Sequence, residues 1–98
     1  SDKKLGVLIV INKKRFTTGI ITDGQVRRST QKNKDLENKI VKSIMTKNPI
    51  SIHKNTLAVK ALSIMNEKKI TSLCVYDRYK KKTIGVLHIH NILSANLR

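Results

Sequence analysis

The sequence predicts an α+β protein made of two similar small units, and three observations support this class. Short apolar runs rich in Val and Ile alternate with polar connections, as strands do, and one longer segment has the apolar spacing of an amphipathic helix. The third is an internal repeat, because residues 19–22 and 85–88 each close a predicted hairpin and Val26 and Ile92 follow at the same offset. With 98 residues the chain suits one compact domain or two very small units, which excludes a large two-domain enzyme.

The first unit is predicted to open with a hairpin. Residues 5–11 form an apolar run with lysines before and after it, which is typical of a buried strand. Residues 16–22 form a second strand, and the polar connection between the two is short enough for a hairpin loop. A helix is then predicted to begin at Asp23, with Val26 as its first inward residue.

A polar stretch separates the two units. Residues 29–38 show no apolar period and are predicted to form a linker with, at most, helical ends. One helical turn follows and stops near Pro49, since the residue before a proline avoids the helical region. That turn is formed by Val41, Ile44 and Met45. Residues 50–52 then alternate like a short strand.

The clearest helix of the chain comes next. Asn55 or Thr56 is predicted to cap it, and Lys68 and Lys69 near its carboxyl end suit the helix dipole. Its broad apolar stripe consists of Leu57, Ala58, Ala61, Leu62, Ile64 and Met65. Its water-facing residues are Lys60, Asn66 and Glu67.

A second hairpin and a final helix close the chain. Residues 72–77 and 84–89 are the predicted strands, joined by the basic turn 78–82. A helix is predicted over residues 91–97, with inward side chains from Ile92, Leu93 and Leu97. The first repeat lacks the opening strand and helix of the second and is therefore incomplete. Two such units are expected to pack about a pseudo-two-fold axis, because a hairpin alone is marginally stable.

Composition limits the classes of function. The net charge of +15 would attract nucleic acid or an anionic ligand, but only three aromatic residues exist to stack on bases, so no specific nucleic acid is expected as a partner. No apolar run approaches the roughly 20 residues of a membrane helix and no signal segment opens the chain, so we expect a cytoplasmic protein without a membrane partner. Cys74, in an apolar run, is predicted to be a buried thiol. The sequence holds no close acid-base pair, nucleophilic triad or metal constellation, so no catalytic or metal site is expected.

Short motifs recur along the second repeat, at residues 44–46, 49–50, 58–65, 70–77, 85–87 and 92–93. Together these segments resemble a cystathionine-β-synthase (CBS) repeat that extends from about residue 40 to 97. The division implied is a partial first repeat with linker at 1–38 and a second repeat at 39–98. The fold implied is a tandem CBS pair, each repeat a small β-sheet covered by helices.

A narrower resemblance connects both repeats to one enzyme family. Residues 19–24 with Arg27 and Arg28, together with residues 85–90, resemble the CBS pair (Bateman module) at the carboxyl end of bacterial arabinose-5-phosphate isomerases. In that family an amino-terminal sugar-isomerase domain interconverts ribulose 5-phosphate and arabinose 5-phosphate for synthesis of the lipopolysaccharide sugar Kdo. The resemblance implies that this chain is a regulatory, non-catalytic module attached to such a domain, and that it forms homodimers.

The resemblance also implies a ligand, CMP-Kdo or an adenosine nucleotide, in the cleft between the repeats, with no cofactor required. The residues predicted to contact it are Thr22, Asp23, Arg27, Arg28, Lys69, Thr71, His88, His90 and Asn91. Family members often carry an Asp three residues after the Ser or Thr that contacts ribose, and here Gln25 and Asn91 stand at those positions. This departure leaves open the alternative of an architectural dimerisation module without a ligand.

Overall fold

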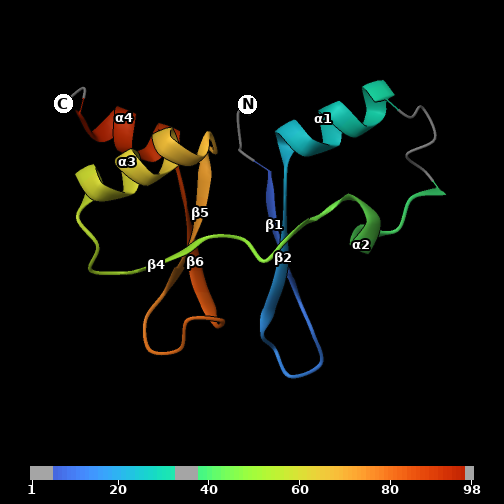
Figure 1. Cartoon of the computed structure of the whole chain (residues 1–98), viewed down its shortest axis with the longest axis horizontal. Helices are drawn as coiled ribbons and strands as arrows, with labels where there is room; N and C mark the ends of the chain where they lie inside the picture. The colour runs from blue at the N-terminus through green and yellow to red at the C-terminus, as the bar shows by residue number, and fades with distance from the viewer. Residues whose placement is uncertain (1–5, 33–37, 97–98) are drawn as a thin grey trace. The chain divides into compact units, whose positions relative to one another are not determined.

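The computed structural model describes residues 6–32 and 38–96, and the chain divides into two compact units, Ser1–Pro49 and Ile50–Arg98 (Figure 1). Each unit contains a three-stranded sheet and helices, so the predicted α+β class is confirmed. The repeat boundary after residue 38 stays a prediction. No helix within the described ranges is both long and apolar enough to cross a membrane.

The first unit is built on a hairpin followed by a helix. Strands β1 (Val7–Ile11) and β2 (Thr17–Thr22) pair antiparallel, as their β-branched composition favours. Helix α1 (Asp23–Lys32) follows β2 directly and continues further into the predicted linker than the apolar pattern indicates. Nothing in residues 29–32 interrupts the helix, and the Thr30 hydroxyl donates to the Val26 carbonyl at 2.8 Å. Residues 33–37 of that linker lie outside the described residues.

A helical turn and a short strand complete the first unit. Helix α2 (Val41–Ile44) leads into β3 (Thr46–Lys47), which pairs antiparallel with β2 and places Lys47 opposite Gly19. Gly19 is buried, and the Met45 thioether occupies the space that a Cβ on residue 19 would need. A Cβ at residue 19 would therefore displace the Met45 side chain from its place over β2.

The second unit contains a parallel and an antiparallel strand pair. Strand β4 (Ser51–His53) pairs in parallel with β5 (Ser72–Tyr76), and helix α3 (Ala58–Lys68) connects the two. Strand β6 (Thr83–His88) pairs antiparallel with β5 and leads into helix α4 (Ile89–Asn96). This strand order, β4-β5-β6, places β5 between β4 and β6, and the described residues of the first unit include no strand equivalent to β4.

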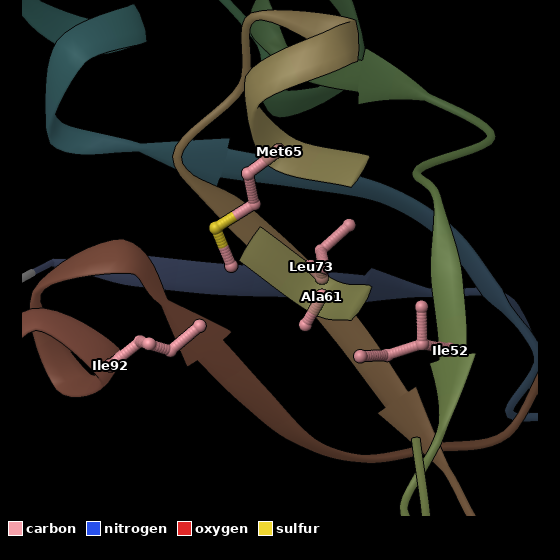
Figure 2. Packing of buried hydrophobic residues seen from close by; sticks show 5 residues of the cluster. All are labelled: Ile52, Ala61, Met65, Leu73 and Ile92. Atoms are coloured by element: carbon pink, nitrogen blue, oxygen red, sulfur yellow. The ribbon is translucent and has the colours of Figure 1, made fainter. Parts of the chain in front are cut away.

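The core of the second unit lies between its sheet and α3 and α4. Figure 2 shows the five side chains of the cluster: Ile52, Ala61, Met65, Leu73 and Ile92. Ala61 and Met65 lie one helical turn apart and face the sheet together, which explains why both are almost fully buried. Cys74 is fully buried, as predicted. Burial raises the pKa of its thiol, while a hydrogen bond with Thr83 lowers it in part.

Helix α3 differs from the sequence prediction at its amino end. Its N-cap is Leu57, which makes no side-chain capping hydrogen bond, so the predicted cap by Asn55 or Thr56 is wrong. The Asn55 amide instead donates to His53 Nδ1 at 3.1 Å. Leu57 and Ala58 were expected to face inward but are exposed, because they precede the part of the helix that packs on the sheet.

Helix α4 also differs in its start and its inward face. It begins at Ile89, two residues before the predicted start, so the predicted strand over residues 84–89 ends one residue early. Ile92 is buried as expected, whereas Leu93 is 42% exposed because the face that meets the core is centred on Ile92. Leu97 lies outside the described residues.

Candidate functional site

Both units present the same junction, at which the second strand of a hairpin runs directly into a helix. The junction lies between Thr22 and Asp23 in the first unit and between His88 and Ile89 in the second. The first turn of a helix has N–H groups without intrahelical partners, so polar ligands are readily accommodated there. All predicted ligand residues except Lys69 and Thr71 are at or near these junctions in the sequence.

At the first junction, Thr22 and Gln25 cap α1 reciprocally. The Thr22 amide donates to Gln25 Oε1 at 2.8 Å, and the Gln25 amide donates to Thr22 Oγ1 at 3.3 Å, which is a capping box. Gln25 Nε2 also donates to the Thr46 hydroxyl on β3. Gln25 therefore holds α1 and β3 together, and both polar ends of its side chain already have protein partners.

Asp23 is fixed by the start of β1. Its amide donates to the Gly6 carbonyl at 3.1 Å, and its carboxylate lies against Gly6 in the space that a Cβ there would need. A carboxylate on the first helical turn interacts favourably with the helix dipole but repels an anion at the same place. Asp23 is thus suited to accept hydrogen bonds from ligand hydroxyls.

An open hollow of about 440 Å³ runs along α1 and is lined by Asp23, Val26, Arg27 and Thr30. Asp23 and Arg27 are four residues apart and so share one face of the helix, which brings a hydrogen-bond acceptor and a cation together. The hollow includes Val26 and Thr30, which the sequence prediction did not assign to a site. The available signal was helical spacing, because Val26 lies three residues after Asp23 and Thr30 three residues after Arg27. Arg28 does not line it and instead folds back toward Gly24.

At the second junction, two histidines stack. The His90 amide donates to His88 Nδ1 at 3.1 Å, and the two rings lie 4.9 Å apart between centroids with 22° between their planes. The two histidines do not share a strand, because His88 ends β6 and His90 belongs to α4. Since Nδ1 accepts a hydrogen bond, a neutral His88 ring carries its proton on Nε2. The described residues include no cluster of three or more His, Cys, Asp or Glu arranged for a metal ion.

Of the other predicted ligand residues of the second unit, Asn91 and Thr71 are hydrogen-bonded at this junction, whereas Lys69 is at the end of α3. The His88 amide donates to Asn91 Oδ1 at 2.9 Å, so Asn91 caps α4 much as Gln25 caps α1. Thr71 is joined to the junction, because its carbonyl accepts a hydrogen bond from the Ile89 amide at 2.8 Å. Lys69 is the exposed left-handed C-cap of α3, with φ of 57°.

Two curated relatives match nearly the whole chain. Protein RP505 of Rickettsia prowazekii, which is uncharacterized, is 41% identical over 97 residues, covering 99% of this chain and 29% of its own length. Arabinose 5-phosphate isomerase KdsD of Yersinia pestis is 36% identical over 95 residues, covering 97% of this chain and 28% of its own length. This chain therefore spans less than a third of each relative.

Solved structures show the same fold. The CBS domain pair of protein MJ0100, in complex with 5′-methylthioadenosine and S-adenosyl-L-methionine, has a TM-score of 0.78 at 22% identity, covering 94% of this chain and 72% of that one. CBSX2 in complex with AMP has a TM-score of 0.71 at 25% identity, covering 93% of this chain and 70% of that one. In sequence, the family model described as CBS domain matches residues 41–98, more than half of the chain. These residues and this fold place the chain in the CBS-domain family, as the resemblance of its second repeat predicted.

Proposed function

We propose that this chain is the regulatory, ligand-binding module of a sugar-phosphate isomerase that interconverts arabinose 5-phosphate and ribulose 5-phosphate for synthesis of Kdo and lipopolysaccharide. The 36% identity to KdsD over nearly the whole chain supports this parent enzyme. The observation that carries ligand binding is the open hollow on α1, where the Asp23 carboxylate and the Arg27 guanidinium share one face. Catalysis belongs to an amino-terminal isomerase domain, and the parent protein is cytoplasmic.

The ligand we propose is a nucleotide or nucleotide sugar. A guanidinium binds phosphate or carboxylate groups through paired N–H donors, so Arg27 receives the anionic part of the ligand. Asp23 accepts hydrogen bonds from the hydroxyl groups of the ligand. AMP or ATP fits this chemistry, and CBSX2, at 25% identity, was solved with AMP. CMP-Kdo fits as well, because it adds a carboxylate to its phosphate.

Titration calorimetry with AMP, ATP and CMP-Kdo tests the proposal. Replacing Arg27 by Ala should raise the dissociation constant of the ligand by about tenfold to more than a hundredfold. This corresponds to about 1.5–3 kcal/mol of binding free energy for a lost hydrogen bond to a charged group. Arg28→Ala is the matched control, since it removes the same charge from a side chain that does not line the hollow. An equal loss in both variants would show that general charge, and not this site, attracts the ligand.

The alternative function is an architectural module that dimerises without a ligand. A specific observation favours it: Gln25 and Asn91, at the positions where the family often has Asp, both cap their own helices. If none of the three compounds binds below millimolar concentration, the architectural function replaces the regulatory one.

A further inference from the structure

The turn between β5 and β6, residues 78–82, is a cluster of cations around one aromatic ring. Its sequence is Arg-Tyr-Lys-Lys-Lys, and all of its residues are exposed. Arg78 Cζ lies 5.9 Å and Lys82 Nζ 5.7 Å from the centroid of the Tyr79 ring. Tyr79 itself is 58% exposed. This basic turn therefore presents cations and an amphipathic phenol together on the surface of the second unit.

The charge of the basic turn is not balanced by acidic residues from its own repeat. Asp77 is the only acidic side chain between residues 68 and 98 in the sequence. Asp77 Oδ1 lies 3.4 Å from Lys54 Nζ, so a further lysine at the base of the turn offsets this carboxylate. The turn and its base thus combine five cations with one carboxylate, and the local excess of charge is strongly positive.

The turn between β1 and β2 of the first unit has the same character. Residues 13–15 are Lys-Lys-Arg, and the exposed Phe16 follows them. The Asn12 side chain holds this turn, because its Oδ1 accepts hydrogen bonds from the Lys14 and Phe16 amides, each at 2.9 Å. Arg15 has a φ of 68°, a left-handed conformation that glycine adopts without strain. Each hairpin therefore ends in a group of cations beside one aromatic residue.

The basic turn is separate from the junction that carries the candidate ligand residues of its unit. Strand β6 begins beside the turn at Thr83 and ends at the junction at His88. A strand rises roughly 3.4 Å per residue, so these two residues are about 17 Å apart. In Figure 1 the turn lies at the end of the β5–β6 hairpin that is away from α3 and α4. A ligand at the junction therefore does not account for the charge of the turn.

We propose that the basic turn docks on an anionic membrane surface. Each Lys or Arg held near anionic headgroups increases partitioning to the membrane by about fivefold. Tyrosine is favoured at the level of the headgroups, because its ring is apolar and its hydroxyl is polar. The long lysine side chains bury their stems along the interface and keep their ammonium groups in water. The inference does not depend on the proposed ligand.

Docking at a membrane surface needs no membrane-spanning helix. It therefore agrees with the finding that no helix in residues 6–32 and 38–96 is long and apolar enough to span a membrane. The expectation of no membrane partner was based on the lack of a spanning segment and a signal segment, and it does not bear on binding at the surface.

A single-stranded nucleic acid is the alternative polyanion, and the geometry around Tyr79 argues against it. Single strands bind by stacking their bases on aromatic faces. Arg78 and Lys82 already lie over the Tyr79 ring, where they compete with a base. The turn also has three lysines to one arginine, and lysine lacks the planar pair of donors that arginine offers to base edges. Anionic headgroups, in contrast, require only point charges and an amphipathic ring.

Sedimentation with lipid vesicles tests the proposal on the chain itself. The chain should pellet with vesicles of phosphatidylglycerol and phosphatidylcholine in equal parts at about 0.1 M salt, and should stay in solution with phosphatidylcholine alone. Replacing Lys80 and Lys81 together by Ala should lower the partition coefficient by at least about tenfold. The matched control replaces Lys60 and Lys68, two exposed lysines of α3, and should lower it by less than about threefold. Equal losses from both pairs, or no binding to the anionic vesicles, would overturn the proposal.

A tryptophan in the turn provides the second measurement, because the chain contains none. The fluorescence of Tyr79→Trp should shift to shorter wavelength when anionic vesicles are added, and lipids with brominated tails should quench it. Leu57→Trp, at an exposed position at the start of α3, is the control and should show neither change. Absence of both changes in Tyr79→Trp, or equal changes in both variants, would overturn the proposal.

A competition experiment separates the two polyanions. Excess single-stranded oligonucleotide at the same salt concentration should leave most of the chain on the anionic vesicles. Displacement from the vesicles by the oligonucleotide, together with loss of oligonucleotide binding when Lys80 and Lys81 are replaced, would assign the basic turn to nucleic acid and would overturn the proposal.

Discussion

Leu8 and Leu73 occupy equivalent positions in the two repeats, because they pair with the equivalent residues Ile21 and Leu87, so the same substitution at both measures what the covering helix contributes. Leu73 is fully buried, and truncating such a leucine to Ala costs about 2–5 kcal/mol through lost transfer free energy and the cavity that remains. Leu8 is 64% exposed, so its side chain contributes only about a third of the roughly 2 kcal/mol of stabilisation that full burial of a leucine provides. We therefore expect about 3 kcal/mol for Leu73→Ala and less than 1 kcal/mol for Leu8→Ala.

Urea unfolding followed by circular dichroism measures both losses. With a slope of about 1–3 kcal/mol per molar urea, the Leu73→Ala midpoint should fall by about 1 M or more. Pulsed labelling of the buried Cys74 thiol reports opening of the second unit separately, and its urea dependence should shift only in the Leu73 variant. Leu73→Val, with a loss of about 1 kcal/mol, provides a measurable variant if the alanine chain does not fold.

Two results would refute this reasoning. A loss below 1 kcal/mol for Leu73→Ala would mean that the core of the second unit is not centred on β5 and α3. A loss for Leu8→Ala as large as that for Leu73→Ala would mean that Leu8 is covered in solution, and its dependence on protein concentration would show whether a second copy covers it.

Four further predictions concern stability, assembly and charge. Lys69→Gly should stabilise the chain by about 1 kcal/mol in thermal melts, because a non-glycine residue is strained at its φ of 57°; an unchanged melting temperature would contradict this. Because the pKa of Cys74 is raised in the folded chain, its thiol ionises at lower pH in the unfolded chain than in the folded one, and the free energy of unfolding should be constant below about pH 9.0 and decline above it. In urea titrations at several pH values, Cys74→Ala should reduce this decline. Sedimentation at micromolar concentration should show a homodimer, and a clean monomer of 11.1 kDa would exclude it. Binding to duplex DNA should be weak and lost at moderate salt despite the charge of +15; sub-micromolar affinity for one sequence at about 150 mM salt would contradict this.

The two hairpins, the helix over residues 58–68 and the buried Cys74 were predictable from the sequence. Apolar residues repeating every two positions, or every three to four, reveal strands and helices because they reflect local backbone geometry. The two strand-to-helix junctions were predictable for the same reason, together with the repeated offset from Gly19 to Val26 and from Gly85 to Ile92. The positions of most candidate ligand residues followed from those junctions.

Only the tertiary structure decided which partners these local elements find. Strand β3 has two polar residues and no periodicity, and it is a strand because β2 offers it backbone hydrogen bonds. The sequence shows that Gln25 can form hydrogen bonds but not with which residue. Its role as a link between α1 and β3 depends on Thr46, which is far away in the sequence. Leu8 and Leu73 are equally apolar, yet one is exposed and the other buried, because burial depends on whether a helix packs above the strand. A sequence pattern marks the face that can be covered, whereas the covering element is set by contacts between distant parts of the chain.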